Sequence, residues 1–206
     1  MKIFFNYLGQ LRLYTLADLI LLLVAIGAST HQFYGAILLH VGFLAYLESR
    51  HAHSYRAKVP ANAAYALTFI GIVLFRKIEG LLYVLFSYLY PKKNKNLGWM
   101  SPFARGFQYF FMVAGIIGYA SGITYLVGVL TFFRNLAGDM RDTEKDRFEG
   151  MNTIPVLLNI KKSIPHIHLI AVIITSSVWW HLSSLSIAWL VVVMLIQLLT
   201  YKLTPR

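Results

Sequence analysis

The chain has 206 residues, of which 58% are hydrophobic and 13% charged, and its formal net charge is +11. Soluble globular domains are about a quarter charged, so this composition argues against an ordinary soluble domain and favours a membrane protein. The chain contains no cysteine, which excludes disulfides and thiolate metal sites.

Long apolar runs predict the helices in chain order. They cover residues 16–28, 36–47, 63–75, 81–90, 107–119, 123–133, 167–180 and 185–199. Several runs are shorter than the roughly 20 residues of an upright membrane span, but weakly polar flanking residues extend most of them. We therefore expect an all-α fold, a polytopic bundle of about eight transmembrane helices that forms a single membrane domain over residues 1–206.

The basic residues predict the orientation of these helices. With the amino terminus in the cytoplasm, seventeen of the 19 Lys and Arg residues fall on the cytoplasmic face, and only Arg76 and Lys77 fall on the other. This bias follows the positive-inside rule, so we expect a multi-pass integral membrane protein with both termini cytoplasmic. The topology accounts for the positive charge, and the expected surroundings are a lipid bilayer, with no nucleic-acid partner.

Carboxylates are concentrated in one cytoplasmic segment, because five of the eight acidic residues lie between positions 139 and 149. On a continuous helix, the spacing of Asp139, Asp142 and Asp146 places them within an arc of about 60°. Three carboxylates so close repel one another, and Mg²⁺ relieves that repulsion while also binding phosphate oxygens. The segment therefore predicts a Mg²⁺ site for a phosphate-bearing lipid.

Basic side chains interleave with these acids and leave two interpretations open. Arg141, Lys145 and Arg147 are candidates to neutralise a diphosphate. Alternatively they pair with the acids, as Asp142 would with Arg141 or Lys145 at a solvated helix end.

Three residues outside the acidic segment are further candidates. Asn135, at the mouth of the sixth predicted helix, is expected to bind phosphate, and Lys92 is a candidate diphosphate contact in a basic loop. Asp18 lies inside the first predicted helix, where an ionisable residue is either functional or paired, for example with Arg12.

Residues 135–158 resemble a known motif. Their sequence is N-L-A-G-D-M-R-D-T-E-K-D-R-F-E-G-M-N-T-I-P-V-L-L. The motif is the second aspartate-rich motif of the UbiA-type intramembrane prenyltransferases, D-x-x-D-x-x-x-D-R-x-x-G-x-x-T-[LI]-P-V. The matched positions are Asp139, Asp142, Asp146, Arg147, Gly150, Thr153, Pro155 and Val156.

The resemblance implies an all-helical bundle around a central cavity open to lipid. Two aspartate motifs at its cytoplasmic side would hold Mg²⁺ and a prenyl diphosphate. Metal and basic residues would assist departure of the diphosphate, and a hydrophobic acceptor, aromatic or lipid, would attack the resulting allylic cation. The family therefore implies a transferase with Asp139, Asp142 and Asp146 at its catalytic centre.

The first aspartate motif of that family aligns with residues 47–55, where its three aspartate positions become Glu48, His51 and Tyr55. Glu48 is the remaining carboxylate and a candidate metal ligand. His51 and His53 suit a transition metal better than Mg²⁺, but two histidines in a basic loop beside a membrane are more often lipid-headgroup residues than metal ligands. This departure leaves an alternative open: a degenerate relative that binds an isoprenoid lipid or quinone without chemistry, as a subunit of a larger membrane complex.

Overall fold

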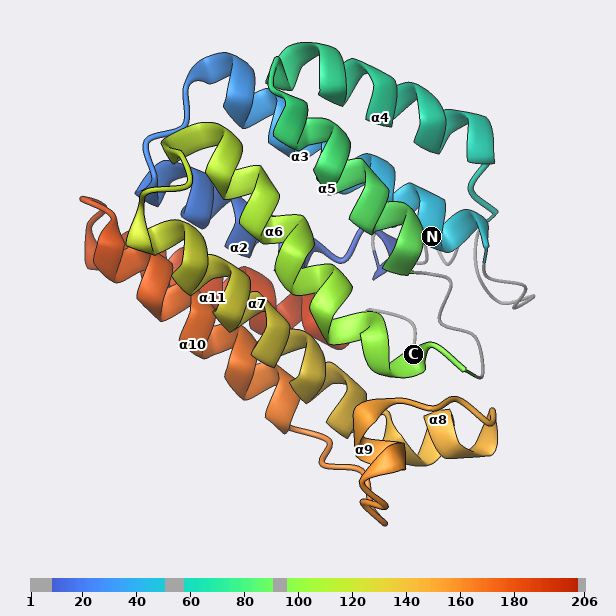
Figure 1. Cartoon of the computed structure of the whole chain (residues 1–206). Coiled ribbons are helices and arrows are strands. Elements are labelled where there is room, and N and C mark those ends of the chain that lie inside the picture. Colours follow the sequence, from blue (N-terminus) through green and yellow to red (C-terminus); the bar gives the residue numbers. More distant parts are fainter. Residues whose placement is uncertain (1–8, 51–57, 91–95, 204–206) are drawn as a thin grey trace. The chain divides into compact units, whose positions relative to one another are not determined.

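The computed structural model describes residues 9–50, 58–90 and 96–203, and within these ranges the chain is all-α, as predicted. Each of the eight apolar runs overlaps one long helix (Figure 1). The long helices are α2 (Leu13–Ala25), α3 (Thr30–Ser49), α4 (Ala61–Phe75), α5 (Ile78–Leu89), α6 (Ser101–Ile117), α7 (Gly122–Arg141), α10 (Ile167–Leu182) and α11 (Ile187–Tyr201). The short ones are η2 (Gly98–Met100), α8 (Thr143–Phe148) and α9 (Ile154–Leu157).

The long helices differ in length. Helices α3 and α7 have 20 residues each, about 30 Å at 1.5 Å per residue. The other six have between 12 and 17 residues. Over the ranges that the structure describes, no helix reaches both the length and the apolar character needed to cross a membrane.

The chain divides into two compact units. The first comprises the described residues of Met1–Gly80 and Ser176–Arg206, and the second those of Leu81–Thr175. The first unit contains α2, α3, α4, α11 and the second part of α10. The second contains most of α5, the helices from η2 to α9, and the first part of α10.

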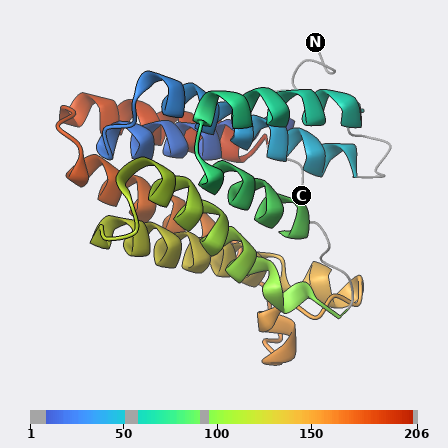
Figure 2. The ribbon, with the colours of Figure 1, turned by 45° about the horizontal axis from the view of Figure 1, so that its top comes forward.

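Glycines bring α3 and α4 of the first unit into backbone contact, and Figure 2 shows the two helices side by side. A Cβ atom on Gly35 would lie 2.6 Å from the amide nitrogen of Phe75, and one on Gly71 would lie 2.8 Å from that of Leu39. Only glycine allows backbones to approach so closely. The two helices therefore pack as one hairpin whose spacing these residues determine.

A buried polar chain links three helices of the first unit. The Ser176 hydroxyl of α10 donates to Asp18 Oδ1 of α2 at 2.7 Å, and Gln197 Nε2 of α11 donates to Ser176 Oγ at 2.6 Å. All three side chains are buried. Asp18 is therefore bonded across the helix bundle to α10. Arg12, its suggested partner, pairs with Glu48 at 3.2 Å.

The second unit is built around α6 and α7, which pack side by side. A Cβ on Gly106 would lie 3.0 Å from the carbonyl oxygen of Gly128. On another side of α6, Phe86 of α5 stacks on Phe107, with ring centroids 5.3 Å apart. Helix α6 begins at Ser101, directly before a proline that suits the first helical turn.

Candidate functional site

The acidic segment lies where α7 ends and α8 begins, and Asp142 separates the two helices. Helix α7 ends at Arg141, α8 begins at Thr143, and Asp142 has φ −97° and ψ 9°. Figure 1 shows α8 running in a different direction from α7. The prediction that Asp139, Asp142 and Asp146 share one face of a continuous helix is therefore wrong.

The helix breaks because a distant segment replaces its hydrogen bonds. In a continuous helix the amide of Glu144 would donate to the carbonyl of Met140. Here the Glu144 amide donates to Ser163 Oγ at 3.0 Å, and the Met140 carbonyl accepts from the Ile164 amide at 3.1 Å. The Thr143 hydroxyl also donates to the Met140 carbonyl, at 2.9 Å, and such side-chain bonds compete with the helix.

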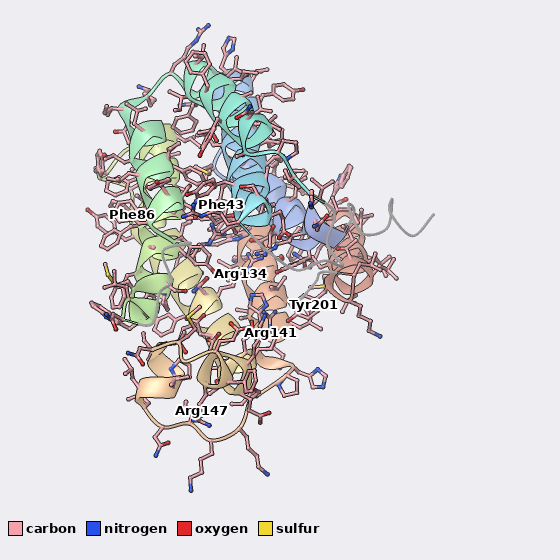
Figure 3. All side chains as sticks on the ribbon, turned by 90° about the vertical axis from the view of Figure 1, so that its right-hand side faces the viewer. Phe43, Phe86, Arg134, Arg141, Arg147 and Tyr201 are labelled. Carbon is pink, nitrogen blue, oxygen red and sulfur yellow. The ribbon has the colours of Figure 1, made fainter. Side chains whose placement is uncertain are left out.

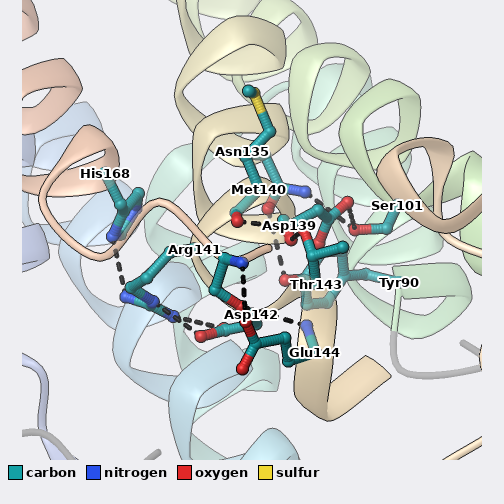
Figure 4. A network of polar contacts seen from close by, with 11 residues as sticks. Tyr90, Ser101, Asn135, Asp139, Met140, Arg141, Asp142, Thr143, Glu144 and His168 are labelled. Atoms are coloured by element: carbon teal, nitrogen blue, oxygen red, sulfur yellow. Dashed lines mark hydrogen bonds and ion pairs between the residues drawn. The ribbon is translucent and has the colours of Figure 1, made fainter. Parts of the chain in front are cut away.

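Asp139 is buried in the last turn of α7, at the end of a chain of polar side chains (Figure 4). The Tyr90 hydroxyl donates to Asn135 Oδ1 at 3.2 Å, and Asn135 Nδ2 donates to Ser101 Oγ at 2.7 Å. The Ser101 hydroxyl in turn donates to Asp139 Oδ2 at 3.4 Å. Asn135, predicted to bind phosphate directly, thus helps to orient the serine that contacts Asp139.

Asp142 forms an ion pair with its neighbour Arg141, one of the two partners that the alternative interpretation suggested. Arg141 Nε donates to Asp142 Oδ1 at 2.7 Å. Arg141 Nη1 lies 2.9 Å from Nδ1 of His168, which is almost completely buried. Because arginine can only donate, His168 Nδ1 is the acceptor and its ring proton lies on Nε2. Arg141 is therefore held between a carboxylate and a neutral imidazole.

Asp146 and Arg147 belong to α8, and Figure 3 shows Arg147 in the part of the second unit that extends beyond Arg141. Asp146 is buried, whereas Lys145 and Arg147 are exposed. Arg147 donates to the carbonyl oxygens of Lys161, at 3.1 Å, and Ile160. Arg147, predicted to contact a diphosphate, thus holds α8 against the segment that follows α9.

The non-acidic residues Gly150, Thr153 and Pro155 of the motif determine the local backbone conformation. Gly150 has a φ of 69°, a left-handed conformation that glycine adopts without strain. Thr153 is the N-cap residue of α9, and Pro155 occupies its first turn. The motif therefore encodes a turn and a helix start as well as its carboxylates.

The remaining candidates lie elsewhere in the chain. Glu48 belongs to the first unit, is buried in the last turn of α3, and accepts hydrogen bonds from Arg12 at 3.2 Å and Gln10 at 3.4 Å. His51, His53 and Lys92 lie outside the described residues.

The acidic segment contains carboxylates of the chemical type that Mg²⁺ binds. Within the described ranges, no three His, Asp or Glu side chains are arranged together to hold a metal ion. Mg²⁺ needs only one or two protein carboxylates, however, since water and substrate phosphates complete its coordination. The buried carboxylates of Asp139 and Asp146 are hard oxygen donors of this kind.

Ser101 and His168 are site residues that the sequence did not reveal. Ser101 precedes Asp139 by 38 positions and His168 follows Arg141 by 27. The Ser-Pro pair at positions 101–102 signals a helix start, but nothing in it indicates a contact with an aspartate.

Comparisons of this chain with protein-family models, with curated proteins and with solved structures find no match.

Proposed function

We propose that this chain is an intramembrane prenyltransferase that transfers a polyprenyl group from its diphosphate to a hydrophobic acceptor. The observation that carries the proposal is the burial of Asp139 and Asp146 within a segment that matches the UbiA-type motif. Buried carboxylates are costly, and in membrane proteins they are typical of functional sites. The hydrogen bond from Ser101 to Asp139 adds the fixed orientation that a ligand requires.

In this proposal Asp139 and Asp146 would hold Mg²⁺, and Asp142 would be a third ligand once Arg141 turns to the diphosphate. The bound ion would supply Lewis-acid assistance to departure of the diphosphate. The protein's own residues then have separate tasks. Ser101 and Asn135 orient the Asp139 carboxylate, and Arg141 offers the diphosphate a guanidinium that is already in contact with His168.

We place the protein in a membrane, with the acidic segment and both termini cytoplasmic. Exposed apolar stripes support this placement: α4 exposes Tyr65, Phe69 and Val73 along one face, and α11 exposes Leu195 and Leu199. Such stripes are unfavourable in water and stable where lipid covers them. The distribution of Lys and Arg supports the same orientation.

The test is release of diphosphate from a prenyl diphosphate by the purified protein, with and without Mg²⁺. We expect Asp139→Asn and Asp142→Asn to lower the rate by about 100-fold or more, because each removes a charge that binds the metal. Glu149→Gln is the matched control, since Glu149 is an exposed acid of the same segment and should leave the rate unchanged. Unimpaired turnover in Asp139→Asn would refute the proposal.

A second candidate is a protein that binds an isoprenoid lipid or quinone without chemistry, within a larger membrane complex. The ion pairs Arg141–Asp142 and Arg12–Glu48 favour it, because two candidate metal ligands already have cationic partners. Binding of a prenyl diphosphate that is equally tight in EDTA, with no turnover, would support this candidate over the first.

A further inference from the structure

Apolar side chains are exposed on the short helices that follow α7. The exposed fraction of the residue is 93% for Phe148, 71% for Leu158 and 58% for Leu157. None of the three contributes to the core of the second unit. Large apolar residues grouped in this way mark a surface that contacts something other than water.

Two contacts bring these residues together with a tryptophan. Arg147 binds the carbonyls of Ile160 and Lys161, so the end of α8 that carries Phe148 lies beside the segment that follows Leu158. Gly98 of η2 packs on the backbone at Asn152, where a Cβ would lie only 2.9 Å from the carbonyl carbon. Trp99 follows Gly98 in the chain, so its backbone lies close to the start of α9. Trp99 is 41% exposed, and its ring packs edge-on against Phe103, with ring centroids 6.1 Å apart.

Basic side chains surround the apolar ones. Lys145, Lys161 and Lys162 are exposed, as is Arg147. Two exposed acids, Glu144 and Glu149, lie in the same stretch, and Glu144 accepts a hydrogen bond from the Ser163 amide at 3.2 Å. Four cations against two anions leave the surface positive. We call this surface the interfacial patch; its members are Trp99, Lys145, Arg147, Phe148, Leu157, Leu158, Lys161 and Lys162.

We infer that the interfacial patch rests on the headgroup region of an anionic lipid bilayer. Helices α8 and α9 have six and four residues, about 9 and 6 Å, far less than a bilayer is thick. They therefore lie on a membrane and do not cross it. Tryptophan and phenylalanine are favoured at this depth, and lysine keeps its charge near the phosphates while its stem covers apolar surface.

The positive charge selects the lipid. A purely apolar patch would fit a neutral bilayer or another protein equally well, whereas lysines beside it are complementary to anionic headgroups. The inference requires a bilayer surface and no chemistry at Asp139, so it stands or fails separately from the proposed transferase.

Because the chain contains no cysteine, a single introduced cysteine reports on one position alone. Leu158→Cys, labelled with the fluorophore NBD in the full-length protein, places the probe in the interfacial patch. The protein is reconstituted into vesicles of phosphatidylcholine, with or without phosphatidylglycerol. Doxyl-labelled lipids quench the probe if it touches the bilayer, and iodide quenches it from water.

We expect strong doxyl quenching and weak iodide quenching in the anionic vesicles. Substituting Lys161→Gln and Lys162→Gln should lower the ratio of docked to undocked probe by about fivefold for each lysine. A probe at Ala120→Cys is the control: Ala120 lies in the α6–α7 turn, at the opposite end of α6 from Ser101, and should not respond to the lysine changes.

Three results would overturn the inference. A probe at residue 158 that iodide quenches equally in both kinds of vesicle would show that the patch faces water. Protection from iodide without doxyl quenching would show that protein covers it. Doxyl quenching that is indifferent to anionic lipid and to both lysines would show that charge plays no part. Diphosphate release by the same lysine variants, measured in parallel, separates these results from the fate of the proposed transferase.

Discussion

Replacement of Gly35 by alanine tests the packing of α3 on α4. The new Cβ atom would lie 2.6 Å from the amide nitrogen and 2.8 Å from the Cα of Phe75. Ordinary contact begins at 3.4 Å, so the two helices must separate locally by about 0.8 Å. The obstructing atoms belong to backbone and cannot rotate away, so the strain cannot be relieved by a change of rotamer.

Two opposing terms determine the size of the effect. Overpacking of this kind costs about 1–3 kcal/mol. Alanine is more favourable than glycine within a helix by about 1 kcal/mol, which offsets part of that cost. We expect a net loss of up to about 2 kcal/mol in the free energy of unfolding, which lowers Tm by up to about 8 °C in a chain of this size.

Thermal unfolding followed by far-ultraviolet circular dichroism measures the change, with all proteins under the same solution conditions. Gly122→Ala is the matched control, because no atom lies within 4 Å of its new Cβ and Gly122 begins α7. This control should be as stable as the parent or slightly more stable. If Gly35→Ala melts at or above the temperature of Gly122→Ala, backbone contact does not set the spacing of α3 and α4.

Three further predictions concern hydrogen bonds. Ser101→Ala should lower kcat for diphosphate release by about 10–100-fold with little change in KM, because Asp139 loses a donor that orients it. Ser101→Thr should restore much of the rate, and a parental kcat in Ser101→Ala would exclude the positioning role. Ser176→Ala should lower the free energy of unfolding by about 1.5–3 kcal/mol, since it removes a donor to the buried carboxylate of Asp18. Ser184→Ala, at an exposed position between α10 and α11, is the control, and an equally small effect of the two substitutions would contradict the prediction. Arg147→Gln should accelerate amide hydrogen exchange at residues 160–163, because the carbonyls of Ile160 and Lys161 lose their donor; exchange at the parental rate would show that Arg147 does not hold this segment.

The acidic segment shows which structural features a local sequence pattern can predict and which it cannot. Its composition and spacing singled out Asp139 and Asp146, both of which are buried in the structure. The same pattern predicted a continuous helix, because nothing between residues 139 and 149 is a strong helix breaker. The break at Asp142 depends on Ser163 and Ile164, about 20 positions further along the chain. Helical periodicity carries no information about such a distant competitor for backbone hydrogen bonds.

The roles of the basic residues also depended on distant contacts. From sequence, Arg141 and Arg147 were equivalent candidates for a diphosphate. In the structure Arg147 binds backbone carbonyls, whereas Arg141 lies between Asp142 and His168. Arginine offers five donors to any nearby acceptor, so its partner is determined by whichever acceptor the fold brings within reach.

The sequence by itself determined the helices and the position of the acidic segment. Apolar runs and their polar boundaries are local features, and a helix forms its backbone hydrogen bonds within one segment. Only the tertiary structure decided which side chains meet: Ser101 at Asp139, Ser176 at Asp18, and the Phe75 backbone at Gly35. These contacts join positions far apart in the chain, and they arise from how neighbouring helices pack, which no single segment encodes.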